Sequence, residues 1–288
     1  MDETFCKSIN RRVGIIGGSG WIGRSLLQAM LGKGVLAADK LAISNTSGKH
    51  PFPDQWPQVK VLRDNQALAE ACEVLIISVR PEQFSAVSID APNALIISMM
   101  VGISLQRLQD CTGSQRIIRA MPNAALEIGR GYIPWCASEA VSTEDKILAR
   151  SLFASAGQTD EVADETLLDY LTGLSGTGPA YPALLAEALM EHALQKGLPA
   201  EVARRAANAV VVNASQMISR GRSSEALIQS LMDYKGVTAA GLREMIKCGF
   251  KQVVASGLDQ AELKAQQMGS DPGQHDSAIG IQPDSLSR

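Results

Sequence analysis

Two segments of the chain combine glycines with hydroxyl groups at spacings that suit ligand binding. The first, residues 13–23, has the sequence VGIIGGSGWIG, in which Gly18, Gly20 and Gly23 follow the pattern G-x-G-x-x-G. A short apolar run precedes these glycines, and apolar residues at helical spacing follow them. This order of strand, glycine turn and helix predicts a dinucleotide site, since the glycines let a pyrophosphate approach the helix N-terminus. An ordinary strand-to-helix turn is the alternative.

The second segment, residues 169–181, has the sequence DYLTGLSGTGPAY. Ser175, Gly176 and Thr177 interrupt an apolar helical run with small residues and hydroxyls, and Pro179 can open the helix that follows. Backbone N–H groups at a helix start lack intrahelical partners and bind anions. We therefore expect this segment to contact a ligand, and a plain loop between two helices is the alternative.

Composition argues against several classes of partner and site. A net charge of −3 over 288 residues gives no reason to expect nucleic acid or a membrane as a partner. The five cysteines form no CxxC pair and the three histidines lack metal-ligand spacing, so we expect a reducing compartment and no metal. The N-terminus lacks the apolar core of a secretory signal, and the longest mostly apolar run, residues 94–103, is too short for a bilayer. We expect a soluble, cytoplasmic protein.

Strand and helix signals alternate in the first part of the chain. The expected strands are residues 13–16, 41–44, 59–62, 74–79, 94–98, 116–120 and 131–136, and the expected helices are residues 22–31, 66–72, 81–87, 104–110 and 143–156. Continuous apolar strands indicate a parallel sheet that helices cover on both faces. The predicted fold class is therefore α/β, with an N-terminal Rossmann-type doubly wound sheet.

The pattern changes near Asp164, after which only helical periods follow as far as Gln267. One helix is expected from Pro199 to Gly221, with Ser223 or Ser224 capping the next. Its residues 206–214 are so apolar that they must be buried on several sides, which predicts a homodimer of intertwined helical domains, able to assemble further.

The chain thus divides into three expected parts. Residues 1–163 form an NAD(P)-binding Rossmann domain, residues 164–267 form an all-α dimerisation and substrate domain, and residues 268–288, rich in Gly, Pro, Ser and Asp, form a disordered tail.

Ligands of an open parallel sheet bind beyond the carboxyl ends of its strands. The second strand ends in Ser44, Asn45 and Thr46, where NAD-binding proteins usually carry an acid for the ribose, and Lys49 is nearby. Neutral donors and a cation suit a 2′-phosphate, so NADPH is the favoured cofactor and NADH the alternative.

Six stretches together resemble the pyrroline-5-carboxylate reductase family, the last enzyme of proline synthesis. They are the glycine fingerprint, Asp64-Asn65, and residues 79–82, 121–123, 174–181 and 236–242, which occur in this order from about Val13 to about Leu263. The resemblance implies a Rossmann domain, a helical dimerisation domain, NAD(P)H, and reduction of a cyclic imino acid, 1-pyrroline-5-carboxylate to L-proline.

The resemblance also implies the site residues. Together with the fingerprint and the second-strand end, the expected cofactor-binding residues are Gly18, Ser19, Gly20, Trp21, Ile22, Ser44, Asn45, Thr46, Asn65, Val79, Arg80, Pro81, Met121, Pro122 and Asn123. Those expected around the substrate are Ser175, Gly176, Thr177, Gly236, Val237 and Thr238. Thr238 is the expected donor near the imine nitrogen, and a helix N-cap role is the alternative reading of this residue.

The chain departs from the family in the substrate loop, where Asp233-Tyr-Lys-Gly-Val-Thr238 replaces the usual Ser-Pro-Gly-Gly-Thr-Thr. Residues 121–125 read Met-Pro-Asn-Ala-Ala in place of Met-Pro-Asn-Thr-Pro. Lys235 is a solvated loop residue, a second carboxylate anchor, or a proton donor if burial lowers its pKa. The open alternatives are a reductase of a different cyclic imine, a 3-hydroxyacid dehydrogenase that uses Lys235, and a nucleotide-binding regulator without turnover.

Overall fold

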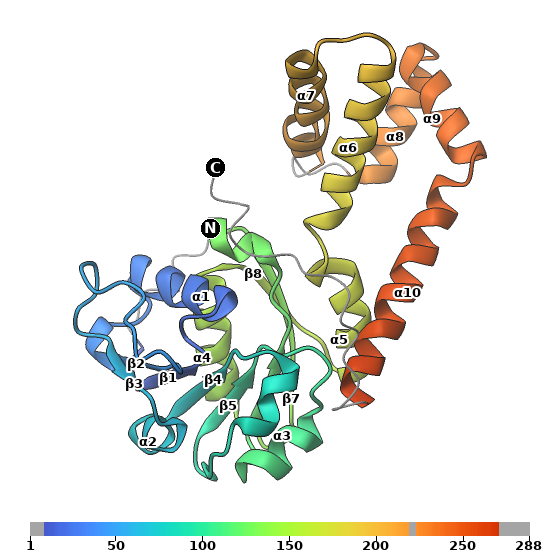
Figure 1. The fold of residues 1–288 in the computed structure, drawn as a ribbon. Coiled ribbons are helices and arrows are strands. Elements are labelled where there is room, and N and C mark those ends of the chain that lie inside the picture. The colour runs from blue at the N-terminus through green and yellow to red at the C-terminus, as the bar shows by residue number, and fades with distance from the viewer. Residues whose placement is uncertain (1–8, 219–222, 271–288) are drawn as a thin grey trace.

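A computed structural model describes residues 9–218 and 223–270, which form a sheet region and a long helical arm that stands away from it (Figure 1). In these residues one sheet has eight strands in the order β3-β2-β1-β4-β5-β6-β7-β8. The strands are β1 (Val13–Ile16), β2 (Leu41–Ser44), β3 (Lys60–Leu62), β4 (Val74–Ile77), β5 (Leu95–Ser98), β6 (Ile117–Ala120), β7 (Gly131–Ala137) and β8 (Gly157–Glu161). Strands β1 to β6 pair in parallel, β7 is antiparallel to β6, and β8 is parallel to β7.

Helices cover both faces of this sheet, which confirms the doubly wound architecture. The helical segments of the sheet region are α1 (Trp21–Gly32), η1 (Ala38–Lys40), α2 (Asn65–Ala71), η2 (Pro81–Ala86), α3 (Leu105–Thr112), η3 (Ala124–Ile128) and α4 (Thr143–Ala154). One core cluster joins the sheet to α1 and α4 through side chains such as Leu27 and Phe153. A second cluster joins the sheet to α2 and α3 through Leu68 and Leu108. Strands buried on both faces can be apolar throughout, and every residue of β1, β4 and β5 is buried.

Two expectations for the sheet region were incomplete. Residues 81–86 form a 3₁₀ helix rather than an α-helix, and α4 ends at Ala154. Strand β8 was missed because its sequence, Gly-Gln-Thr-Asp-Glu, has no apolar alternation and it lies at the edge of the sheet. Gly157 is required there, since a Cβ atom on it would lie 1.9 Å from the Gly131 carbonyl oxygen.

The helical arm consists of α5 to α10 with the irregular turns between them. Its elements are α5 (Glu165–Leu171), η4 (Thr172–Gly176), α6 (Ala180–Gln195), α7 (Ala200–Asn208), η5 (Ala209–Asn213), η6 (Ala214–Met217), α8 (Ser224–Asp233), α9 (Val237–Lys247) and α10 (Phe250–Ser270). Helix α10 runs back down the length of the arm and packs against α5 and η4 beside the sheet (Figure 1). Asp164 caps α5, and Ser223 caps α8 as expected.

Two expectations for the arm need correction. The helix predicted from Pro199 to Gly221 is regular only to Asn208, because η5 is π-helical and η6 is 3₁₀-helical, and Gly221 lies outside the described residues. Helix α10 continues through Ser270, so the predicted tail is helical over residues 268–270, and residues 271–288 lie outside the described part.

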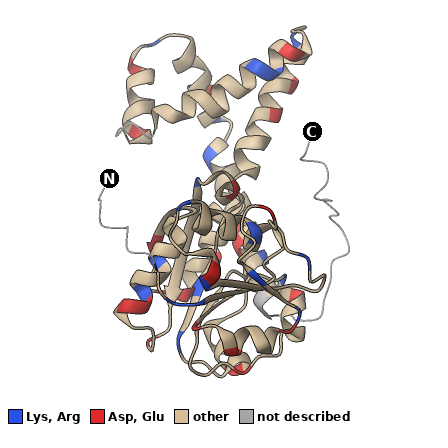
Figure 2. Ribbon diagram, turned by 90° about the vertical axis from the view of Figure 1, so that its left-hand side faces the viewer, with Lys and Arg blue, Asp and Glu red and all other residues tan. Residues whose placement is uncertain are grey.

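The apolar residues of the arm are not buried within one chain. Val210 and Val212 are 52% and 57% exposed, so the burial expected for residues 206–214 would need a second chain, as the predicted dimer implies. Charged residues occur on the arm as well as on the sheet region (Figure 2), but the arm also exposes further large apolar side chains, among them Leu184 and Val253. A single layer of helices cannot bury all its faces, and an apolar surface of this extent marks an interaction site.

Within the described residues, none of the helices has the length and apolar character needed to cross a bilayer.

Candidate cofactor and substrate site

The glycine turn after β1 begins one residue earlier than the fingerprint implies. Gly17 has φ +82°, and a Cβ atom on it would lie 2.4 Å from the carbonyl oxygen of Ser78. The N–H groups of Gly17 and Gly18 both donate to the Ser44 carbonyl, at 3.0 and 3.3 Å. A Cβ atom on Gly23 would lie 2.7 Å from the Gly17 carbonyl oxygen, so α1 packs closely on the turn. These are the backbone constraints that a dinucleotide turn imposes.

The N-terminus of α1 is open to an anion. Gly20 is the N-cap residue, it provides no side-chain hydrogen bond to the helix, and the first turn contains no acidic residue. Trp21 donates its indole N–H to Glu127 at 3.1 Å. Ser19 is exposed and Ile22 is half-buried. Unpaired N–H groups and the helix dipole fit a pyrophosphate here.

The end of β2 is shaped by hydrogen bonds between neighbouring loops. Ser44 is 1% exposed and its hydroxyl donates to Asn65 Oδ1 at 2.7 Å. This hydrogen bond fixes the end of β2 against the start of α2. The Asn45 side chain accepts from the Gly48 N–H at 2.6 Å and closes a tight turn, which leaves Thr46 exposed.

Two cations flank this turn. Lys49 is exposed, and Arg63 donates from Nη2 to the Ser47 carbonyl at 3.3 Å. The guanidinium lies against Gly48, where a Cβ atom would be 2.5 Å from Arg63 Nε. Sequence reasoning missed Arg63, although a cation directly after the third strand was a usable signal. An arginine fork beside a β2 turn fits a 2′-phosphate.

The residues after β4 border the same turn. A Cβ atom on Gly17 would lie 3.1 Å from Val79 Cγ1, so Val79 contacts the glycine turn. Arg80 is exposed, its backbone N–H donates to Gln83 at 3.2 Å, and Pro81 starts η2.

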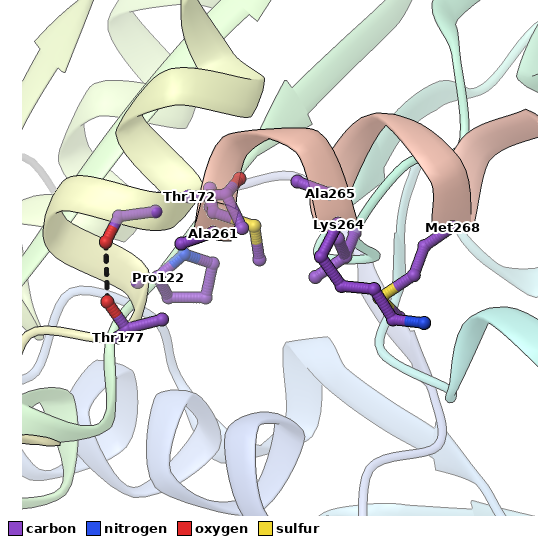
Figure 3. A pocket seen from close by; sticks show the side chains of 11 residues that line it. Pro122, Thr172, Thr177, Ala261, Lys264, Ala265 and Met268 are labelled. Atoms are coloured by element: carbon purple, nitrogen blue, oxygen red, sulfur yellow. Dashed lines mark hydrogen bonds between the residues drawn. The ribbon is translucent and has the colours of Figure 1, made fainter. Parts of the chain in front are cut away.

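A cavity of about 310 Å³ lies where the sheet meets the arm (Figure 3). Its lining residues are Val101, Met121, Pro122, Thr172, Gly173, Gly176, Thr177, Ala261, Lys264, Ala265 and Met268. The fold therefore brings together Met121 and Pro122 from the end of β6 with Gly176 and Thr177 from the second predicted segment. Asn123, the next residue, is fixed by its side-chain oxygen, which accepts from the Tyr132 N–H at 3.2 Å.

The second segment forms a π-helical turn, η4, instead of a break in the helix. The Gly173 carbonyl accepts from the hydroxyls of Thr177 at 2.5 Å (dashed line in Figure 3) and Tyr181 at 2.7 Å. Ser175 donates to the Leu171 carbonyl at 2.8 Å. Each of these hydroxyls has already donated its proton to the helix, so it offers a ligand only its lone pairs. Single π turns are frequent at functional sites.

The loop between α8 and α9 lies at the far end of the arm from the sheet (Figure 1). Gly236 is the N-cap of α9 without a side-chain cap bond, so the alternative reading of Thr238 as the N-cap is wrong. Val237 is 92% exposed, and Lys235 is exposed with φ +53°. None of these residues lines the cavity, so one chain alone does not bring Thr238 to Thr177.

Two buried cysteines of the sheet region have protonated thiols. Burial raises the pKa of Cys72 and of Cys136 to about 11, which keeps both thiols protonated at neutral pH. Among the described residues, no cluster of three His, Cys, Asp or Glu side chains could hold a metal ion.

Comparison with known proteins agrees with this geometry. Residues 165–268 match the family model "Pyrroline-5-carboxylate reductase dimerisation", and residues 12–102 match "NADP oxidoreductase coenzyme F420-dependent". The pyrroline-5-carboxylate reductase of Synechocystis sp. is 31% identical over 264 residues, which are 90% of this chain and 98% of that protein.

Two solved structures share the whole fold. A pyrroline-5-carboxylate reductase from Coxiella burnetii has a TM-score of 0.82 at 25% identity, covering 90% of this chain and 99% of that one. The Plasmodium falciparum pyrroline carboxylate reductase, solved with NADP bound, has a TM-score of 0.77 at 25% identity, covering 91% and 100%. The chain is thus an NAD(P)H-dependent oxidoreductase with a region for self-association. Similarity at this level over nearly the full length of both chains means that the chain belongs to the pyrroline-5-carboxylate reductase family.

Proposed function

We propose that the protein reduces 1-pyrroline-5-carboxylate to L-proline, with NADPH as the preferred hydride donor and NADH as the alternative. The observation that carries this proposal is the cavity at the sheet edge. There Met121 and Pro122 meet the π-helical turn of the arm.

In this proposal the chain mainly binds and orients. The turn at Gly17 to Gly20 and the open N-terminus of α1 hold the pyrophosphate. Met121 and Pro122 are buried and apolar, and they form a flat surface for the nicotinamide ring. The bound cofactor supplies the hydride, which is added to the carbon of the C=N bond. The apolar cavity walls exclude water and orient the C=N carbon of the substrate toward the nicotinamide ring.

The substrate loop must then come from a second chain. In a two-fold symmetric dimer of intertwined arms, the partner's α8–α9 loop can approach this chain's cavity. The uncapped N–H groups at the start of α9 bind the substrate carboxylate, and the Thr238 hydroxyl donates to the ring nitrogen. The exposed apolar arm, including Val210 and Val212, supports this dimer. Residues 1–163 and 164–267 are then the cofactor and dimerisation domains.

Preference for NADPH rests on the β2 turn. Lys49 and Arg63 flank it, and the described turn carries no carboxylate at residues 44–49 that would favour a ribose 2′-hydroxyl.

The decisive assay follows the near-ultraviolet absorbance of the reduced cofactor with purified protein and a panel of cyclic imines, using NADPH and NADH in turn. Consumption of NADPH with 1-pyrroline-5-carboxylate is the expected result. Activity with another imine alone would contradict the substrate assignment. Oxidation of 3-hydroxyacids that is lost in Lys235→Met would identify the dehydrogenase instead. Cofactor binding without turnover on any substrate would identify a regulator.

A further inference from the structure

The wall of the cavity contains a charge that no part of the proposed function uses. Lys264 lies on α10 and lines the cavity together with Ala261, Ala265 and Met268 of the same helix. Its side chain extends away from α10 alongside that of Met268 (Figure 3). Among the described residues that line the cavity, Lys264 is the one with a charged side chain.

Two other cations of the arm pair with acidic residues of their own helix. Lys247 pairs with Glu244 three residues before it, and Arg204 pairs with Glu201 in the same way. The positions three and four residues from Lys264 are occupied by Gln260, Ala261, Gln267 and Met268, none of which is acidic. A lysine on a helix surface can pair with an acidic residue three or four positions away, and α10 offers Lys264 no such residue.

The rest of the cavity offers an anion no other side-chain donor. The hydroxyls of Thr172 and Thr177 donate to the carbonyls of Leu168 and Gly173, at 2.8 and 2.5 Å. The remaining described lining residues are apolar or glycine. An anion in this cavity would therefore be attracted by the Lys264 ammonium above all other side chains that line it.

The cofactor phosphates do not account for this charge. The glycine turn and the β2 turn, where phosphates fit, contribute no described residue to the cavity wall. The anion nearest to the nicotinamide is the carboxylate of the substrate. We propose that Lys264 is a specificity-determining residue that binds the carboxylate of the imino acid, together with the backbone N–H groups of the substrate loop. This inference rests on the proposed function.

The test compares two substrates that differ only in the carboxylate: 1-pyrroline-5-carboxylate and 1-pyrroline. Lys264→Met keeps most of the apolar stem and removes the charge. We expect kcat/KM to fall about tenfold for the carboxylated ring, the low end for a charged hydrogen bond because Lys264 is partly solvated. The value for 1-pyrroline and the Kd of NADPH should stay unchanged. Lys264→Arg should retain activity.

A binding measurement accompanies the kinetics. The inhibition constant of cyclopentanecarboxylate, a ring acid that cannot react, should rise by the same factor in Lys264→Met. The matched control is Lys251→Met, which removes an exposed lysine from the same helix outside the cavity and should change nothing.

Equal losses with both imines would overturn the inference, because Lys264 would then act through the cofactor or the position of α10. Unchanged kinetics with both imines would overturn it as well. Failure of the proposed function looks different, since the wild-type protein would then not reduce 1-pyrroline-5-carboxylate.

Discussion

Arg119 of β6 and Glu165 of α5 form an ion pair that connects the sheet to the helical arm. The Arg119 guanidinium nitrogen is 2.5 Å from the Glu165 carboxylate oxygen, and the arginine side chain is only 5% exposed. A second nitrogen lies 3.3 Å from Asp169, one turn further along α5. Glu165 also accepts from the Leu105 N–H at 2.8 Å and so fixes the start of α3. Because Met121 follows Arg119 by two residues, this cluster fixes the two walls of the cavity relative to each other.

Replacing Arg119 by Met should destabilise the protein. Glu165 and Asp169 would lose their cation while remaining partly buried, and we expect the free energy of unfolding to fall by about 2 kcal/mol. Urea unfolding at a fixed protein concentration measures this. The control, Lys146→Met, removes an exposed pair with Glu161 and should cost below about 1 kcal/mol. Equal effects of the two changes would mean that the Arg119 cluster adds nothing beyond a surface pair.

Acid stability should depend on Asp145, which is buried beneath two arginines. Burial works to raise the pKa of Asp145, but hydrogen bonds from Arg11 and Ser142 outweigh it. Arg116, 3.0 Å away, lowers it further, so the folded pKa lies below the ordinary value of about 3.9.

A depressed folded pKa stabilises the folded state above the unfolded pKa, and the contribution is lost as pH falls through the folded value. The wild-type protein should therefore lose stability between about pH 4 and the folded pKa of Asp145. Asp145→Asn should be less stable at neutral pH and show a flatter decline over that range. Urea titrations at several pH values check this, and parallel declines would exclude Asp145 as the cause.

The cofactor turn should not tolerate a side chain at Gly17. In Gly17→Ala the new Cβ would meet the Ser78 carbonyl at a backbone angle of φ +82°, so the turn must rearrange. We expect the Kd of NADPH, measured by its fluorescence, to rise at least about tenfold. Gly32→Ala is the control, because nothing lies within 4 Å of that position at the end of α1. An unchanged Kd in Gly17→Ala would show that the turn does not bind the pyrophosphate.

Introducing a charge on the apolar surface of the arm should prevent the dimer from forming. In Val212→Glu a carboxylate replaces a valine that is 57% exposed, and burying it without a partner is costly. Light scattering should show a monomer that still binds NADPH, because the cofactor residues all lie in one chain, but no longer reduces the imine. Ile147→Glu makes the same change at a 58% exposed site on α4 and should leave the mass unchanged. A dimer of Val212→Glu would show that η5 is not part of the interface.

The elements that could be predicted from the sequence are those whose residues are uniformly buried or that end at a glycine. Strands such as β4 are apolar at every position, and Gly34 follows the first helix with φ +66°, so the type of these elements was readable, although β4 ends at Ile77 and not at Val79. Edge strand β8 escaped because its sequence has no alternation of apolar and polar residues. The π-helical turn escaped because Ser175 and Thr177 look like helix breakers until their hydroxyls are seen to bond to carbonyls one turn back.

The site was predicted less completely, because it joins residues that are distant in the chain. Motif spacing identified the glycine turn, and the family resemblance identified Met121-Pro122. Arg63 and Lys264 belong to no motif, and only the packing of β3 beside β2 and of α10 against α5 places them at their sites. Which chain supplies Thr238 also depends on the path of the arm.

The central claim is that each site combines the cofactor turn of one chain with the substrate loop of another. Two variants test it together: Gly17→Ala, defective in cofactor binding, and Thr238→Ala, whose loss of a proton donor should cut activity about a hundredfold. Refolded together in equal amounts, half of the dimers should be mixed.

Each mixed dimer would contain one site with an intact turn and an intact loop. We predict recovery of about one quarter of wild-type activity with 1-pyrroline-5-carboxylate, as two-fold symmetry requires. No activity above that of the separate variants would place turn and loop in the same chain and contradict the account.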